Sequence, residues 1–90
     1  MVRRTRLEVL NDMLVAIQKA GGHIKPTHLM YKANLSHKLL NIYLGDLLSR
    51  KMVSEVMVDK THKNIELTDR GSEFLVKFRQ IKQFQDSFGL

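Results

Sequence analysis

The sequence predicts a small α+β domain, mainly helical, in which helices precede and follow a single β-hairpin. Three observations predict this class. The chain has 90 residues, apolar residues recur at helical spacing on both sides of one short segment, and within that segment the apolar period changes to two. A chain of this length forms one domain with a thin core, because it buries only about two-thirds of its unfolded surface.

The first helix is expected from Thr5 to about Ala20. Thr5 and Glu8 have the spacing of a capping box, in which the Thr hydroxyl accepts the Glu8 N–H and the Glu8 carboxylate accepts the Thr5 N–H. Gly21-Gly22 ends this helix, since glycine tolerates the left-handed conformation that follows a helix C-terminus. The residues expected to be buried recur at helical spacing: Leu7, Leu10, Leu14 and Ile17, with Val9 and Met13 widening the stripe.

A second, shorter helix follows an extended link. His23–Lys25 forms the link, because Pro26 disfavours helix in the residue before it. The helix begins at Pro26 or Thr27, where a proline ring suits the first helical turn, and it runs to about Ala33. Its expected buried residues are Leu29 and Met30.

A tight corner leads into the third helix. Asn34-Leu35 is the predicted corner, since Asn tolerates unusual backbone angles, and Ser36 is the predicted N-cap of a helix that runs to about Lys51. Asp46 lies four residues before Arg50 and is expected to pair with it. The apolar face comprises Leu40, Leu44 and Leu47, flanked by Tyr43 and Leu48. The opposite face is polar without being richly charged and comprises Lys38, Asn41, Ile42, Gly45 and Ser49.

After Met52 the apolar period is two. Val56 and Val58 alternate with polar neighbours, and so do Ile65 and Leu67, which predicts two strands of a hairpin. Its expected tip is residues 60–64, which are basic and polar. Thr68 then caps a last helix, with Asp69 favourably placed in the first turn.

The last helix has a nearly heptad apolar stripe. The stripe comprises Phe74, Phe78, Ile81 and Phe88, with Gln85 at the intermediate position. Phe74 and Leu75 are expected to dock on the first helix as core. The far end extends past what a small domain covers, which predicts a partner subunit there. The predicted dimerisation residues are Phe78, Ile81, Phe84 and Phe88.

Helix, link, helix–corner–helix, hairpin and helix is the element order of a winged helix-turn-helix domain. The stretch HLMYKANLSHKLLNIYLGDLLSRKMV, followed by IELTDRGSEFL, resembles a family of small archaeal winged-helix DNA-binding proteins. The resemblance spans roughly His28 to Leu75, and its L-T-D-R-G ending is shared by many winged helices. The residues that carry it are Tyr31, Ala33-Asn34-Leu35-Ser36, Leu39, Tyr43, Leu47, Leu67-Thr68, Gly71 and Leu75.

That resemblance implies both a function and an assembly. Some members of the family are abundant chromatin-associated proteins, and others are predicted transcriptional regulators. In the chromatin-associated members a long last helix forms an antiparallel coiled-coil dimer, which implies a homodimer through the last helix, with a shorter coil here. Residues 1–68 are accordingly expected to form the winged-helix core with a short basic N-terminal arm, and residues 69–90 to form the docking and dimerising helix.

The charge distribution favours a polyanionic partner. The net charge is +6 and the pI is about 9.9, and residues 13–45 contain no Asp or Glu at all. This acid-free span covers the helix–corner–helix pair, and nucleic acid is the commonest partner of such a surface. Its basic residues and histidines are Lys19, Lys25, Lys32, Lys38, His23, His28 and His37.

Candidate base contacts lie on the polar face of the third helix. An α-helix fits the DNA major groove, and Asn41 is the expected base reader, because Asn pairs bidentately with adenine. Lys38 reaches a guanine edge or a phosphate, and Ser36 and His37 suit a phosphate at the helix N-terminus. Ile42 and Gly45 suit a thymine methyl and a close backbone approach. The alternatives are solvated surface for Asn41 and packing against a neighbouring element for Gly45.

Candidate backbone contacts surround this face. Around the second helix they are Lys25, Thr27, His28 and Lys32, which would position the protein without reading sequence. At the hairpin tip they are Lys60, His62 and Lys63, although any hairpin tip is commonly polar and charged. An N-terminal minor-groove arm would comprise Arg3, Arg4 and Arg6.

The leading hypothesis is therefore that the protein binds double-stranded DNA. It would act as a homodimeric transcriptional regulator that places helix 36–51 in the major groove. The alternatives are a sequence-tolerant chromatin or architectural protein, and a winged-helix protein-interaction module that does not bind DNA. RNA binding is less favoured, since there is no RNA-binding motif or aromatic platform. Specificity, effector and direction of regulation are left open by the sequence.

Other classes of function find no support in the sequence. There is no Cys, His23 and His28 lack the i, i+4 spacing of a helical metal site, and no nucleophile or phosphate-loop motif occurs. No enzyme activity, metal, cofactor or small-molecule effector is therefore expected. No transmembrane segment or signal peptide fits either, which predicts a cytoplasmic, nucleoid-associated location.

Overall fold

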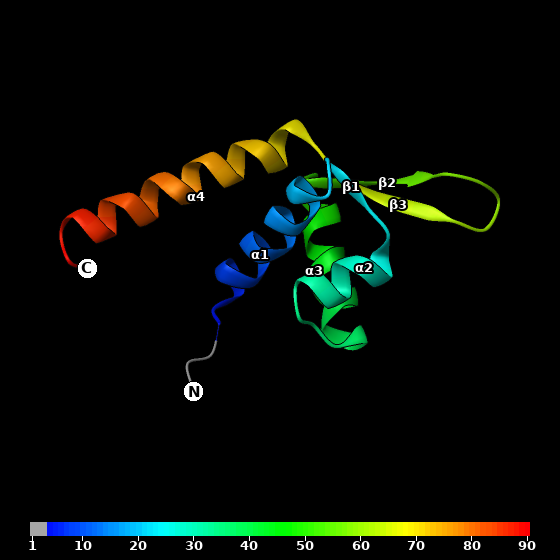
Figure 1. Ribbon diagram of the computed structural model, residues 1–90, viewed down its shortest axis with the longest axis horizontal. Coiled ribbons are helices and arrows are strands. Elements are labelled where there is room, and N and C mark those ends of the chain that lie inside the picture. The colour runs from blue at the N-terminus through cyan, green and yellow to red at the C-terminus, as the bar shows by residue number, and fades with distance from the viewer. Residues whose placement is uncertain (1–3) are drawn as a thin grey trace.

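The computed structural model describes residues 4–90 and has the predicted helix and hairpin order (Figure 1). The helices are α1 (Arg6–Lys19), α2 (Pro26–Lys32), α3 (His37–Ser49) and α4 (Asp69–Ser87). The strands are β1 (His23–Ile24), β2 (Val53–Met57) and β3 (Lys63–Leu67). The predicted caps of α1, α3 and α4 are confirmed, since the side chains of Thr5, Ser36 and Thr68 each accept a backbone N–H.

The link before α2 is a strand, which the sequence analysis did not predict. β1 pairs antiparallel with β3, so the sheet has three strands in the order β1-β3-β2, with His23 opposite Glu66 and Val53 opposite Leu67. Gly21 and Gly22 have φ of 93° and 97°, which turns the chain out of α1 and into the sheet. A two-residue strand is too short to display an apolar period, so the sequence alone carries no signal for it.

The core lies between α1, the helix–corner–helix pair and the inner ends of the strands. Its members are Val9, Leu10, Met13, Leu14, Ile17, Ile24, Leu29, Ala33, Leu40, Leu44, Leu47, Val53, Ile65 and Leu75. The prediction for Leu7 is wrong, because its side chain is 49% exposed. It lies in the first turn of α1, beside a groove whose α4 residues are exposed (Ile81 and Lys82) or only half-buried (Phe78 and Gln85).

The hairpin extends past the helices, so only its base is covered (Figure 1). The predicted alternation does form a strand, but Val56 is 38% exposed and Val58, which follows β2, is 61% exposed. The predicted tip is also displaced, because Lys63 and Asn64 belong to β3 and the loop spans residues 58–62.

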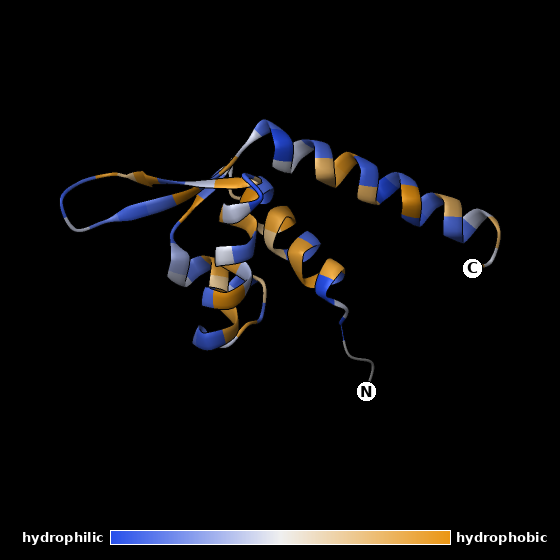
Figure 2. Cartoon of the chain, turned by 180° about the vertical axis from the view of Figure 1, so that it is seen from behind, coloured by the Kyte–Doolittle hydropathy of each residue, from blue (hydrophilic) through white to orange (hydrophobic). Residues whose placement is uncertain are grey.

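α4 docks on α1 through its first half and then leaves the domain. Leu75 is buried and Phe74 packs against the core, and hydrophobic residues recur along the free half of the helix, where the cartoon is orange (Figure 2). The helix start is anchored to the end of α3, because the Thr68 hydroxyl donates to the Lys51 carbonyl at 2.7 Å and accepts the Gly71 N–H at 3.1 Å.

Gly71 occupies a position that has no room for a side chain. A Cβ placed there would lie 2.7 Å from Leu67 Cδ1 and would collide with the backbone carbonyl of Met52. Gly45 on α3 is the opposite case, since none of the described neighbouring atoms lies within 4 Å of a Cβ built there.

We expect Gly71→Ala to lower the free energy of unfolding by about 2 kcal/mol, because the new methyl group overpacks the start of α4. The melting temperature should fall by about 10 °C. Gly45→Ala is the matched control and should stabilise the protein by up to about 1 kcal/mol through helix propensity. Thermal unfolding followed by circular dichroism measures both, and equal melting temperatures would contradict the close approach at Gly71.

Candidate nucleic-acid interface

α3 presents an open polar face. The six residues predicted for this face are all exposed: Ser36, His37, Lys38, Asn41, Ile42 and Gly45. The Ser36 hydroxyl accepts the Leu39 N–H at 3.2 Å and so defines where the helix begins. None of the described neighbouring atoms lies within 4 Å of a Cβ built at Gly45, so packing against a described element does not account for a glycine there.

Asn41 and His37 lie one turn apart on this face. The amide nitrogen of Asn41 lies 3.4 Å from Nδ1 of His37, a long contact that still keeps the two side chains together. Ile42, beside them, is 55% exposed. A donor–acceptor pair next to an apolar side chain matches what a base edge and a thymine methyl group offer in the major groove.

The corner that directs α3 away from α2 is formed as predicted. Asn34 has φ of 55°, a left-handed conformation that Asn tolerates better than most residues. The Leu35 N–H donates to the Met30 carbonyl at 3.0 Å and closes the end of α2. These contacts set the direction in which α3 leaves the corner.

Asp46, at the side of the polar face, is held by two arginines. Its predicted pairing with Arg50 is confirmed at 2.8 Å, and Arg6 of α1 forms a second ion pair with it. The hydrogen bond from Arg50, followed by that from Arg6, holds the pKa of the Asp46 carboxyl below its usual range. The only acid of α3 is therefore neutralised within the protein itself.

The arginines predicted for an N-terminal arm have other partners. Arg4 bonds to Asp12 and to two backbone carbonyls at the corner, and Arg6 bonds to Asp46. Both therefore attach the start of α1 to the helix–corner–helix pair and do not form a free arm. Arg3 lies outside the described residues. The partners in these contacts lie 8 to 40 residues away in the sequence, so no local pattern predicts them.

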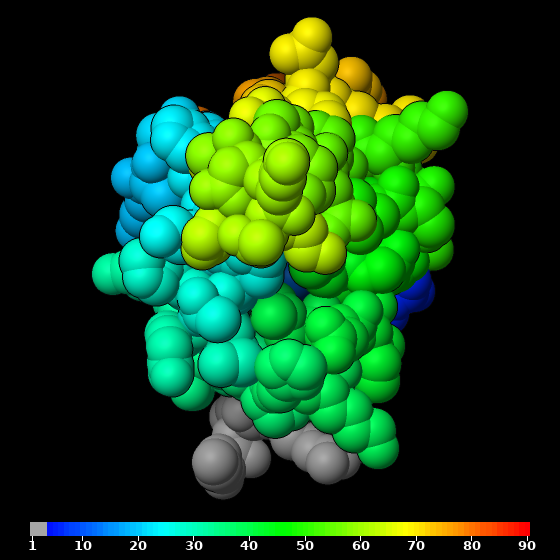
Figure 3. Space-filling view, turned by 90° about the vertical axis from the view of Figure 1, so that its right-hand side faces the viewer, coloured from blue at the N-terminus to red at the C-terminus, as the bar shows by residue number. Residues whose placement is uncertain are grey.

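The residues predicted for backbone contact around α2 are all exposed. Lys25, Thr27, His28 and Lys32 lie on α2 or just before it, and Tyr31, which the family resemblance includes, is 74% exposed beside them. Figure 3 shows the hairpin facing the viewer, with α2 and α3 directly below it. The hairpin, α2 and α3 thus share one side of the molecule.

The hairpin tip is less positive than its lysines suggest. Lys63 forms an ion pair with Glu55, and Nδ1 of His62 lies 2.9 Å from Asp59. The hydrogen bond from the Thr61 backbone N–H is the largest cause that lowers the pKa of the Asp59 carboxyl, and the hydrogen bond with the His62 side chain is the second. Of the three predicted tip residues, only Lys60 has no ion pair within residues 4–90. The positive character lies around α2 more than on the hairpin.

The far half of α4 and its C-cap carry exposed hydrophobic side chains. Ile81, Phe84 and Phe88 are 56%, 59% and 69% exposed, and the rings of Phe84 and Phe88 lie 4.9 Å apart. Phe78, the fourth predicted dimerisation residue, is half-buried and packs near Phe74, with ring centroids 5.9 Å apart. The hydrophobic residues of α4 therefore become more exposed from Phe74, which packs against the core, toward Phe88.

Two further surveys cover residues 4–90. No described helix has the length and apolar character needed to cross a membrane. The described His, Asp and Glu side chains form no group of three or more that is placed to hold a metal ion.

An exposed helix that follows a tight corner, beside a β-hairpin on the same side, defines a winged helix-turn-helix protein. The model of the family described as winged helix-turn-helix matches residues 3–86, and the chain belongs to this family. The winged-helix fold predicted from the sequence is thereby confirmed. No curated protein matches the sequence.

Solved structures show the same fold. The chain is similar to Sso10a-2, a DNA-binding protein from Sulfolobus solfataricus, with a TM-score of 0.81 and 16% identity over 94% of this chain and 85% of that one. It is also similar to F93 from STIV, a winged-helix DNA-binding protein, with a TM-score of 0.73 and 16% identity over 92% of both chains. Staphylococcus aureus MepR, in a complex with DNA, has a TM-score of 0.72 and 16% identity over 90% of this chain and 60% of that one.

We expect Asp46→Asn to destabilise the protein by up to about 1 kcal/mol near neutral pH, since it removes both ion pairs. The folded-state pKa of Asp46 is lowered, so its stabilising contribution is present above the unfolded value of about 3.9 and is lost as the pH falls through the folded value. Urea unfolding from about pH 7 to about pH 2.5 measures the difference between wild type and variant.

The difference should therefore shrink below about pH 4. Glu73→Gln is the control, because it breaks an ion pair with Lys77 in which both side chains are about two-thirds exposed. A difference for Asp46→Asn that stays the same at the lowest pH would show that charge is not its source.

Proposed function

We propose that this protein binds double-stranded DNA by inserting residues 36–51, which comprise α3 and the residues at its two ends, into the major groove. The observation that carries the proposal is the open face of α3, where Lys38, Asn41 and Gly45 are exposed and the nearby Asp46 is neutralised. A face with hydrogen-bonding groups, one apolar side chain and no net negative charge suits base edges between two phosphate chains.

The surroundings of α3 supply contacts to the DNA backbone. Lys25, Thr27, His28 and Lys32 are exposed around α2. Lys60 is exposed in the loop of the hairpin, and the hairpin lies on the same side as α2 and α3. In this proposal the hairpin contributes less than α2, because His62 and Lys63 have acidic partners on the hairpin itself. If about six phosphates are neutralised, the affinity should fall about a thousandfold between about 50 and 200 mM salt.

The role we propose is that of a transcriptional regulator located with DNA in the cytoplasm. The fold is shared with MarR from E. coli and with MepR, a transcription regulator of a multidrug efflux pump. Those proteins are longer, and this chain spans about three-fifths of each. Two alternatives make different predictions: an architectural protein binds all duplexes alike, and a protein-interaction module binds none.

We also propose that the protein is a homodimer, because the exposed stripe of α4 is self-complementary. In antiparallel coiled coils an a position packs against a d position of the second helix. With a two-fold axis beside Gln83, Phe78 lies opposite Phe88 of the second copy and Ile81 lies opposite Gln85. Phe84 flanks this core close to the axis and so gains its own counterpart as an apolar neighbour.

We expect Asn41→Ala to weaken binding to a preferred sequence by tenfold or more, since a bidentate contact to adenine is worth about 1–3 kcal/mol. Its effect on bulk duplex should be much smaller. The preferred sequence is first selected from random duplexes. The selected duplex and bulk duplex are then each titrated with protein in mobility-shift assays over a salt series. Lys38→Ala is tested alongside, and Gln83→Ala, on the free half of α4, is the control.

The outcomes separate the alternatives. Equal weakening of all sequences by Asn41→Ala would contradict base reading by Asn41. If the affinities for the selected duplex and for bulk duplex have a ratio near one, the regulator hypothesis is contradicted and the architectural protein is favoured. Failure to bind duplex at low salt would leave the protein-interaction module.

We expect Gln85→Leu to tighten the homodimer about tenfold or more, because it replaces a polar core residue twice in each dimer. Gln83→Leu is the matched control: position 83 is expected on the outer side of the helix, where the same change has little effect. Removal of all residues after Lys77 should give a monomer. Sedimentation equilibrium measures all three, and a full-length chain that sediments as a monomer, like the truncated one, would contradict a dimer through α4.

A further inference from the structure

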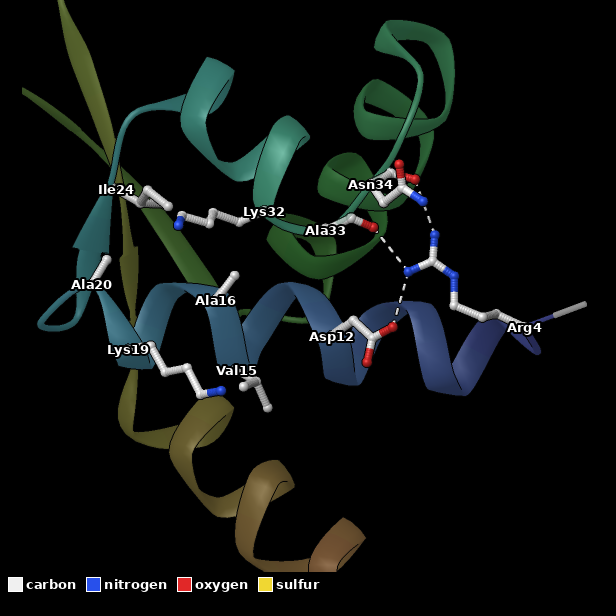
Figure 4. A pocket seen from close by; sticks show the side chains of 10 residues that line it. All are labelled: Arg4, Asp12, Val15, Ala16, Lys19, Ala20, Ile24, Lys32, Ala33 and Asn34. Carbon is white, nitrogen blue, oxygen red and sulfur yellow. Dashed lines mark hydrogen bonds and ion pairs between the residues drawn. The ribbon is translucent and has the colours of Figure 1, made fainter.

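Arg4 bonds to three acceptors at the corner between α2 and α3 (Figure 4). Its Nη1 atom donates to the Ala33 carbonyl at 2.8 Å and to the Asp12 carboxylate at 2.9 Å, and its Nη2 atom donates to the Asn34 carbonyl at 3.1 Å. The acceptors come from α1 and from the corner, which are well separated in the sequence. One guanidinium therefore joins the start of α1 to the helix–corner–helix pair.

The two carbonyls belong to residues that determine the corner. Ala33 is the C-cap of α2 and is buried, and Asn34 has the left-handed conformation that turns the chain toward α3. The last carbonyls of a helix lack partners within the helix and carry the negative end of its dipole, so a guanidinium satisfies both needs. The fork of Arg suits this task because its donors are planar and fixed, whereas those of Lys are not.

A second attachment lies two residues further on. Arg6 pairs with Asp46 on α3, so the start of α1 is attached both before and after the N-terminus of α3. Because the direction of α3 depends on the corner, movement at Asn34 would tilt the face that carries Asn41. The contacts of Arg4 restrain that movement.

We propose that Arg4 and Asp12 are positioning residues for DNA recognition, which hold the corner so that α3 presents its polar face in a fixed direction. This inference rests on the proposed DNA binding and deepens it. It assigns to an N-terminal arginine a role within the protein, in contrast to the minor-groove arm that the sequence suggested.

The two roles for Arg4 predict opposite effects of a single substitution, Asp12→Asn, on the affinity for DNA. Asp12→Asn removes a negative charge and weakens one bond of Arg4, because an amide oxygen accepts less strongly than a carboxylate. If Arg4 contacted phosphate, loss of that charge would strengthen DNA binding and Arg4→Ala would lower the salt slope by about 0.9. If Arg4 positions the corner, Asp12→Asn weakens binding in spite of the favourable charge change, and the salt slope is retained.

The experiment measures duplex affinity over a salt series for Arg4→Ala, Arg4→Lys and Asp12→Asn. We expect each variant to bind between about twofold and thirtyfold more weakly than the wild type, a range typical of residues that act through others. Glu73→Gln is the matched control, because it makes the same charge change and breaks an ion pair far from the corner. Its affinity should equal that of the wild type.

A second readout needs no DNA. In the free protein, the backbone amide signals of Asn34, Leu35 and Ser36 should shift in the ¹H–¹⁵N spectra of Arg4→Ala and Asp12→Asn but not of Glu73→Gln. Stronger binding by Asp12→Asn, loss of about one unit of salt slope in Arg4→Ala, or unchanged corner signals would each overturn the proposal. Duplex binding by the wild type at low salt is the separate test of the proposed function.

Discussion

The burial of α1 is the interaction on which the rest of the molecule depends. Met13, Leu14 and Ile17 are fully buried, and α2, α3, β1, β3 and α4 all contact this helix. Each such side chain contributes roughly 1.5–3 kcal/mol through removal from water. Because one helix is the common support, the polar face of α3, the hairpin and α4 are all placed relative to it.

The charged residues of the domain are arranged so that acids near the proposed interface are paired. Asp46 is neutralised by Arg6 and Arg50, and Asp12 by Arg4, which leaves the exposed lysines of the helix–corner–helix pair as the uncompensated charge. The same pairing on the hairpin, where Glu55 and Asp59 meet Lys63 and His62, reduces the positive charge there. A count of basic residues therefore overestimates the uncompensated positive charge of the hairpin relative to that around α2.

Local patterns predicted most of the elements, because each depends on contacts within a few residues. The capping box at Thr5, the caps at Ser36 and Thr68, and the corner at Asn34 involve hydrogen bonds or backbone angles that nearest neighbours decide. The apolar face of α3 was likewise predicted, since helical spacing leaves little choice about which side is buried. The same helical spacing predicted the polar face on the opposite side, and its residues are exposed in the structure.

The sequence by itself thus determined the element order, the winged-helix fold and the side of α3 that is free, because each is encoded in local spacing. Only the tertiary structure decided that His23–Ile24 joins the sheet, that Leu7 is exposed and that Gly71 lies against the Met52 carbonyl. It also decided where Arg4 and Arg6 bond. All of these depend on groups that are distant along the chain, and no local pattern records which distant groups will meet.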